Sequence, residues 1–300
     1  MTKELLATGK HTVTAITRAD SKSTLPDGIK VVTVDYDKPA TLVEALKGQD
    51  ALVITLSVFA HGQQDKLIDA AAEAGVPWVL PNEWSPDTAH EGLAKEVIGF
   101  GESGKTQQKI KHLGKSSFIA VTCGFWYEWS LSIPAAFGID SIKQEAILFD
   151  EGDVKMSIST WPQVGRAVAA LLSLPIKAEG GDEHRCLEHF RNHHIYIASF
   201  TVSQKDMLDS ALRVTGSKIE DWKITKEPSA DRYKEGMESM QKGDRMGFVK
   251  QMYTRVFFPD DSGNYEKRRG LSNELLGLPK EDIDEATKAA IERQKNAPAW

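Results

Sequence analysis

Pairs of side chains that could hold a ligand follow four short apolar segments in the first third of the chain. Each pair lies at or just after the end of its segment, so all four would meet at one edge if the segments were neighbouring parallel strands. Open α/β sheets bind their ligands beyond this carboxyl edge. We therefore predict one binding site from the residues Thr17, Arg18, Asp35, Tyr36, Leu56, Ser57, Pro81 and Asn82.

Arg18 indicates what this site would bind. An acidic residue at the end of the strand would accept hydrogen bonds from the ribose hydroxyls of NAD, whereas arginine offers a planar, charged fork suited to a 2′-phosphate. Thr17 and Arg18 therefore favour NADP(H). Asp35 and Tyr36 would lie beside the adenine, and Asn82 near the nicotinamide ribose. The alternatives are a solvated arginine at Arg18 and a simple turn at Asp35 and Tyr36.

The elements that must position these residues alternate between strand and helix. Segments rich in β-branched residues predict strands, and apolar residues at helical spacing predict helices. Apolar strands separated by helices are typical of a parallel sheet covered on both faces, so we predict an α/β, doubly wound fold. The expected strands span 11–17, 29–34, 51–56, 76–80 and 117–122, and helices between them span 41–46 and 64–74.

The second half of the chain has mainly helical periodicity. Ser203 is a predicted N-cap, because its hydroxyl can accept a hydrogen bond from a free backbone N–H of the first turn. We expect 1–160 to form a dinucleotide-binding domain and 161–300 a smaller, mainly helical substrate lobe interleaved with it. The expected helices span 163–174, 203–214, 229–242, 247–257 and 280–294, with a short strand at 221–226.

Composition excludes several classes of function. The net charge of −6 over 300 residues provides no basic surface for nucleic acid or an anionic membrane. No apolar run approaches the roughly 18 residues that span a bilayer, and the N-terminus has no signal-peptide pattern, so we expect a cytoplasmic protein. Cys123 and Cys186 have no metal-ligand spacing, and the histidines form no closed ligand set, so we propose no metal.

Residues 99–106 (GFGESGKT) match the GxxxxGK[ST] phosphate loop. Asp150, which follows an apolar segment, could supply the magnesium ligand that such a loop needs. A functional phosphate loop needs a buried strand directly before it. The preceding residues 94–98 contain two charges and only two strong strand formers. A nucleotide hydrolase is therefore only a minor alternative.

Four segments, one of which is the Thr17-Arg18 pair, resemble a known family. These are Thr17-Arg18, Val79–Trp84 (VLPNEW), Cys123–Trp129 (CGFWYEW) and Gly165–Leu172 (GRAVAALL), supported by Ser199–Ser203 (SFTVS). Together they resemble the NmrA-like, isoflavone reductase-like proteins of fungi. The resemblance implies an atypical short-chain dehydrogenase/reductase with a Rossmann core. It also implies one of two activities: NADPH-dependent reduction of a small apolar carbonyl or enone compound, or non-catalytic dinucleotide sensing by a regulator of transcription that acts through a protein partner.

The sequence departs from this family at two points. The family begins with a central strand and a GxxGxxG turn, which are absent before the helix expected at 4–8, and our hypothesis is an incomplete gene model. The reductases carry a catalytic lysine on the helix before the strand at 117–122, but Ser103 aligns nearest to it. Lys105, two residues on, is our candidate catalytic residue, with a surface lysine as the alternative.

Overall fold

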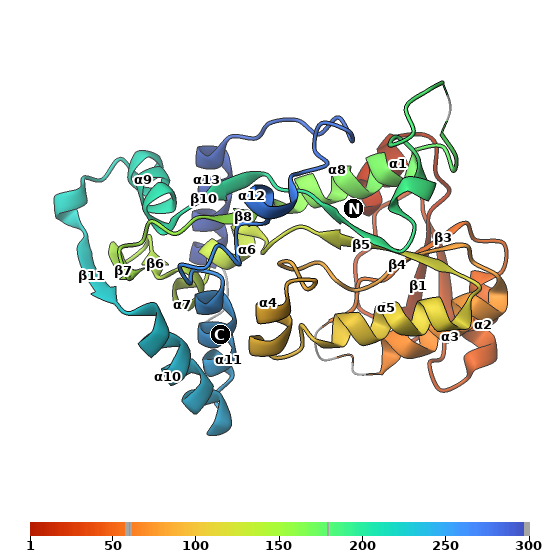
Figure 1. Ribbon diagram of the computed structural model, residues 1–300, viewed down its shortest axis with the longest axis horizontal. Helices are drawn as coiled ribbons and strands as arrows, with labels where there is room; N and C mark the ends of the chain where they lie inside the picture. Colours follow the sequence, from red (N-terminus) through yellow and green to blue (C-terminus); the bar gives the residue numbers. More distant parts are fainter. Residues whose placement is uncertain (58–59, 61, 179, 297–300) are drawn as a thin grey trace.

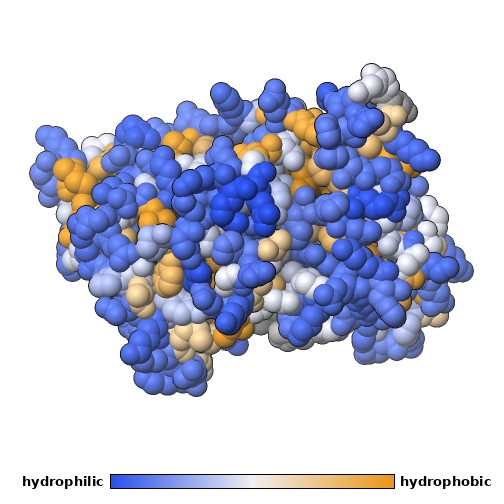
Figure 2. Space-filling view, viewed as in Figure 1, coloured by the Kyte–Doolittle hydropathy of each residue, from blue (hydrophilic) through white to orange (hydrophobic). Residues whose placement is uncertain are grey.

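The computed structural model describes residues 1–57, 60, 62–178 and 180–296, and shows an elongated α/β protein (Figure 1). One half contains parallel strands between helices, and the other contains helices around two small sheets (Figure 1). The predicted α/β class with a parallel, helix-covered sheet is confirmed. The face in Figure 2 carries mainly hydrophilic side chains, with apolar ones scattered in small groups.

The main sheet has four parallel strands in the order β3-β4-β5-β9. Leu52 lies opposite Val79, which lies opposite Phe118, so the registers continue across the sheet. The last strand, β9, comes from the second half of the chain and pairs with β5. The strands span Ala51–Val53 (β3), Trp78–Leu80 (β4), Ser117–Thr122 (β5) and His193–Tyr196 (β9).

Alternate side chains of the main sheet pack against different helices. Val79 and Phe118 belong to the apolar cluster with α2, α3 and α5, whereas Trp78 and Ile119 belong to the cluster with α8. All six residues of β5 are buried, as expected of a strand covered on both faces. The covering helices are α2 (Pro39–Leu46), α3 (Gln63–Ala74), α5 (Glu102–Leu113), α8 (Trp161–Leu172) and, packed on α8, α1 (Thr2–Ala7).

Strands β1 (Thr14–Arg18) and β2 (Lys30–Val34) form a separate parallel pair. Thr17 lies opposite Thr33, and Arg18 lies opposite Val34. Val34 belongs to the same apolar cluster as helices α2 and α3. This packing holds the pair against those helices although the described strands form no ladder between β1 and the main sheet.

The C-terminal half has the expected helices and also two small sheets. Edge-to-face rings of Phe137, Phe149 and Phe257 fill its core. Ser203 caps α9 by accepting a hydrogen bond from the backbone of Asp206, as predicted. The sheets are β11 (Lys223–Glu227)-β7 (Glu145–Phe149)-β6 (Ile139–Asp140) and β10 (Phe200–Val202)-β8 (Met156–Ile158). The helices are α6 (Tyr127–Leu131), α7 (Pro134–Phe137), α9 (Gln204–Thr215), α10 (Ser229–Gln241), α11 (Arg245–Arg255), α12 (Tyr265–Arg269) and α13 (Ile283–Asn296), with short 3-10 turns at Leu187–Phe190 and Ile219–Asp221.

Residues 99–106 lack the context of a phosphate loop. Helix α4 (Glu91–Glu96) precedes them instead of a strand, and α5 begins at Glu102, inside the motif. Asp150 follows β7 in the sheet of the C-terminal half. Because phosphate-binding amides of such a loop are presented by a strand-to-helix turn, this segment does not have the required geometry.

The described helices are short. The longest of them, α13, has 14 residues and includes six charged side chains. A helix that spans a bilayer needs about 20 mostly apolar residues. Among the described residues, no helix meets both the length and the hydropathy needed to cross a membrane.

Candidate functional site

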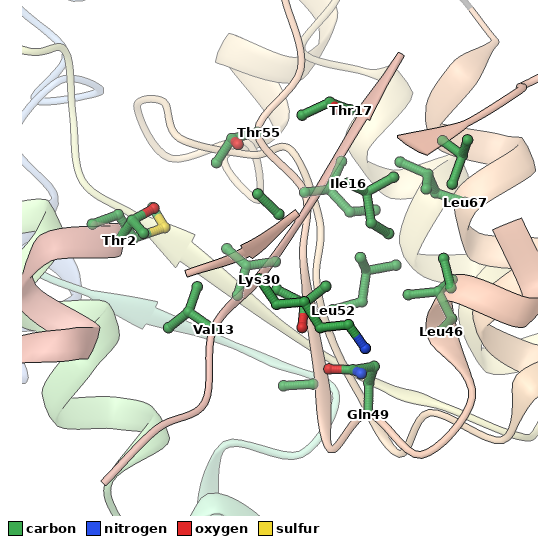
Figure 3. A pocket seen from close by; sticks show the side chains of 18 of the residues that line it. Thr2, Val13, Ile16, Thr17, Lys30, Leu46, Gln49, Leu52, Thr55 and Leu67 are labelled. Atoms are coloured by element: carbon green, nitrogen blue, oxygen red, sulfur yellow. The ribbon is translucent and has the colours of Figure 1, made fainter. Parts of the chain in front are cut away.

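A cavity of about 1920 Å³ lies between strands β1 and β3 (Figure 3). Figure 3 shows Thr17 and Thr55 towards one end and Val13 and Gln49 towards the other, so both strands run in the same direction. The carboxyl ends of β1 and β3 therefore open at the same end of the cavity. Six of the eight predicted binding residues line it: Thr17, Arg18, Asp35, Tyr36, Leu56 and Ser57.

Arg18 is positioned by the last pair of the β1–β2 ladder. Its side chain is 67% exposed, and its Nε lies 3.5 Å from Oδ1 of Asp20. A single exposed ion pair at this distance contributes little energy, so the guanidinium can turn towards a bound anion at little cost. Tyr36 lies near enough for the charge of Arg18 to lower the pKa of its phenol, although burial raises that pKa more strongly.

Asp35 is an ionised carboxylate at this end of the cavity. The backbone N–H of Asp37 donates to its Oδ1 at 2.9 Å, and Nζ of Lys38 lies 3.1 Å from its Oδ2. These two partners lower the pKa of Asp35. The backbone of Asp35 is also bonded to the hydroxyl of Thr41, which fixes the turn after β2.

Asn82 and Trp84 join the ends of β3 and β4. The Asn82 side chain accepts a hydrogen bond from the backbone N–H of Leu56 at 3.0 Å and donates to its carbonyl at 3.1 Å. Nε1 of Trp84 donates to the carbonyl of Ile54 at 2.8 Å. These three bonds, named here the strand-end clasp, hold the segment 54–57 at the mouth of the cavity. Asn82 and Pro81 themselves lie beside the cavity lining and not in it.

Lys105 lies on the solvent side of α5. Its side chain is 75% exposed, and its ammonium lies 2.7 Å from Oε1 of Glu102. Acid–base catalysis by lysine needs an ammonium desolvated near the substrate, and this one is exposed to solvent. The geometry therefore favours the surface-lysine alternative for Lys105.

A buried polar network lies next to the ends of β4 and β5. Nε2 of Gln107 donates to Oε2 of Glu83 at 2.9 Å and lies 2.9 Å from Nε2 of His194. Nδ1 of His194 lies 3.0 Å from the hydroxyl of Thr122, and Thr88 donates to Glu83. This Glu83–Gln107–His194 network is continuous from α5 to the edge strand β9.

Burial changes the titration of both ends of this network. Glu83 is only 5% exposed, and its Oε1 has no hydrogen-bond partner among the described residues. Desolvation raises the pKa of Glu83, while bonds from Gln107 and Thr88 oppose the shift. Desolvation lowers the pKa of His194. Each group is thereby biased towards its neutral form, which is the form that can hold or pass a proton inside a protein.

Sequence reasoning missed this network. Glu83 lies in the segment Val79–Trp84 that carried the resemblance, and a carboxylate three residues after a buried strand was a usable signal. Gln107 and His194 gave no such signal, because they are 87 residues apart and meet only when β9 pairs with β5. Among the described residues, no group of three or more His, Cys, Asp or Glu side chains is arranged to hold a metal ion.

Parts of the sequence match known proteins. A family model described as NAD(P)H-binding matches residues 1–81. Over 288 residues, the chain is 28% identical to "Oxidoreductase aprR" of Aspergillus flavus, a match that covers 94% of this chain and 91% of the relative.

Solved structures of reductases have the same fold. The crystal structure of an isoflavone reductase superposes with a TM-score of 0.71 at 15% identity, covering 95% of this chain and 94% of the other. The NADPH-dependent quinone oxidoreductase of Escherichia coli, complexed with NADPH, superposes with a TM-score of 0.68 at 20% identity, covering 95% and 93%. The matched domain is described as NAD(P)H-binding, and the overall fold is that of these solved structures. The predicted resemblance to the NmrA-like, isoflavone reductase-like proteins is thereby confirmed.

Proposed function

We propose that this protein binds NADP(H) at the carboxyl ends of β1, β2 and β3 and reduces a small, apolar carbonyl or enone compound. The observation that carries the proposal is the position of Arg18. Its guanidinium stands at the end of β1, beside Tyr36 and at the mouth of the cavity, where an adenosine 2′-phosphate would be held in a sheet of this kind. The bound NADPH named for the E. coli quinone oxidoreductase supports the same cofactor.

The described residues fit the adenosine side of such a cofactor. Arg18 supplies a planar donor for the 2′-phosphate, and Tyr36 supplies a half-buried ring for stacking. Ser57 and the backbone of Leu56 would extend this surface along the end of β3. The described lining contains no glycine-rich turn, so these residues account for binding of the adenosine part and not of the pyrophosphate.

A bound NADPH would supply the hydride, and the protein would orient it and provide a proton. The group we assign to the proton is the buried carboxyl of Glu83. Its raised pKa favours the protonated acid, and Gln107 and His194 connect it to the carboxyl end of β5. Lys105 would take no part in this step, because its ammonium is paired with Glu102 in solvent.

The test is the cofactor preference of R18A, with K30A as the matched control. Lys30 lines the same cavity at the opposite end of the β1–β2 pair. A charged hydrogen bond contributes about 1.5–3 kcal/mol, so R18A should weaken NADPH binding roughly 10- to 150-fold and leave NADH unchanged. K30A should leave both unchanged. Titration calorimetry that finds equal losses for NADPH and NADH, or none, contradicts the assignment of Arg18.

A second function is favoured by the exposure of Lys105. Without a desolvated lysine near the strand ends, the protein could bind the dinucleotide without turning it over and act as a sensor for a protein partner. A panel of quinones, enones and aromatic aldehydes separates the two functions. Consumption of NADPH with any of them identifies a reductase, and binding without consumption identifies a sensor.

A further inference from the structure

The two oxygens of the Glu83 carboxyl have different surroundings. Nε2 of Gln107 donates to Oε2 at 2.9 Å, and the hydroxyl of Thr88 donates to the same atom at 3.2 Å. The other oxygen, Oε1, is buried, and it forms no hydrogen bond with any residue that the structure describes. Within the described network, Oε1 is therefore the atom left to bond to a bound molecule.

The amide of Gln107 determines which nitrogen of His194 carries a proton. The nitrogen of a glutamine amide has two hydrogens to donate and accepts none, so both of its partners must be acceptors. These partners are Oε2 of Glu83 and Nε2 of His194, each at 2.9 Å. Nε2 is therefore unprotonated, and the proton of neutral His194 lies on Nδ1, 3.0 Å from the hydroxyl of Thr122.

The same hydrogen bonds place the proton of the neutral Glu83 carboxyl. A carboxyl oxygen that carries a proton has less capacity to accept hydrogen bonds than one that does not. Oε2 already accepts two, from Gln107 and Thr88, so the proton belongs on Oε1. A buried donor without an acceptor is costly, and this O–H group therefore favours an acceptor oxygen on a bound molecule.

The surroundings of the network favour a neutral carboxyl beside a neutral imidazole. Burial is the strongest influence on both groups, since it raises the pKa of Glu83 and lowers the pKa of His194. Weaker influences come from polar side chains around Glu83 and from charged or titratable ones around His194. The first set is Gln107, Thr88 and Ser103, and the second is Asp87, Arg269 and His193.

We propose that Gln107 is a positioning residue whose amide, anchored on His194, keeps the proton of Glu83 on Oε1, the oxygen that gives it to the substrate. This inference rests on the reduction proposed above. In that reaction the carbonyl carbon receives a hydride from NADPH, which leaves as NADP⁺, and the carbonyl oxygen takes the proton as the O–H bond of Glu83 breaks. The carboxylate that remains accepts hydrogen bonds from Gln107 and Thr88 until it regains a proton from water.

The experiment is an NMR titration of the full chain without NADPH, with ¹³C in the glutamate carboxyls and ¹⁵N in the histidine rings. The Glu83 signal is assigned by its loss in E83Q. In the parent we expect the proton of His194 on Nδ1. In Q107L the Glu83 carboxyl should bind its proton about tenfold more tightly or more, because the carboxylate loses a hydrogen bond, and the His194 proton should be shared between both ring nitrogens.

Two further variants make this result specific. Q108L is the matched control, since Gln108 is the next residue of the same helix and is exposed, and it should leave both signals as in the parent. Q107N has an amide that is one methylene shorter, so it cannot bridge Glu83 and His194. It should change the signals in the same direction as Q107L, and it replaces Q107L if that variant does not fold.

Three NMR results would overturn the proposal. They are unchanged Glu83 and His194 signals in both Gln107 variants, an equal change in Q108L, and a proton on Nε2 of His194 in the parent. The last result would mean that the Gln107 amide presents its oxygen to both partners, so that the Glu83 proton lies on Oε2.

Turnover of NADPH with the substrate panel named above is measured separately. If the parent reduces a substrate, the alkaline limb of its profile of kcat against pH should move to higher pH in Q107L, because Glu83 keeps its proton longer. A limb that does not move refutes the transfer of this proton to the substrate. If the parent reduces no substrate, the proposed reduction fails, whereas the position of the proton is decided by the NMR signals alone.

Discussion

Replacing Asn82 by alanine tests whether this residue stabilises the strand ends or contacts the cofactor. The variant removes two hydrogen bonds to the backbone of Leu56, at 3.0 and 3.1 Å. Each such bond contributes about 1 kcal/mol in a half-buried setting, so we expect a loss of about 2 kcal/mol. For a chain of 300 residues, that corresponds to a fall in Tm of about 3 °C.

The assay is thermal unfolding without NADPH, together with hydrogen exchange of residues 54–57. A loss of 2 kcal/mol that acts locally speeds exchange there about 30-fold. W84F removes the third bond of the strand-end clasp and should cost about 1 kcal/mol, because its ring still packs. Q49A, which changes another amide side chain of the cavity wall, is the matched control and should leave the exchange of 54–57 unchanged.

Two results would refute this reasoning about Asn82. If N82A melts within 1 °C of the parent and exchanges at the same rate in 54–57, the strand-end clasp does not stabilise the sheet. If N82A is as stable as the parent but binds NADPH more weakly, direct contact with the cofactor is the better account of the residue.

Three further predictions concern the buried ionisable groups Glu83, Asp87 and Cys123. Burial raises the folded pKa of Glu83, so the stability held by its protonated form is present below the unfolded pKa of about 4.3 and is lost as the pH rises through the folded value. The side chain of E83Q stays neutral at every pH, so the Tm of this variant should fall less than that of the parent as the pH rises from 5 to 8. Curves of Tm against pH that run parallel for the two proteins would contradict this. D87N replaces the fully buried Asp87 carboxylate, whose Oδ2 lies 3.1 Å from Nη1 of Arg268, by a neutral amide. We expect the free energy of unfolding in urea to fall by about 3 kcal/mol. An unchanged urea midpoint would show that this ion pair does not stabilise the protein. Burial raises the pKa of the Cys123 thiol to about 12, so it should react with a thiol reagent only after denaturant is added, and rapid labelling of the native protein at this residue would contradict its burial.

The proposed NADP(H) site was predictable only as a set of strand ends. Arg18 and Tyr36 were chosen because the residue after a strand in a parallel sheet faces the ligand edge whatever the rest of the fold does. Glu83 was adjacent to a predicted residue but received no role, since its burial depends on Gln107 and Thr88 packing over it. Lys105 was chosen by its distance along the helix, and only its exposure and its contact with Glu102 show that it faces solvent.

The sequence by itself determined the order and type of most elements, the α/β class and the strand ends at which we propose that the ligand binds. Those properties depend on local patterns: β-branched runs, helical spacing, the Ser203 cap and the residue that follows each strand. The tertiary structure decided which distant residues meet. The pairing of β9 with β5 brings His194 to Gln107, and the separation of β1 from β3 leaves two strand edges across one cavity. Such contacts join residues far apart in the chain, and their energy comes from packing and shared hydrogen bonds that no local pattern encodes.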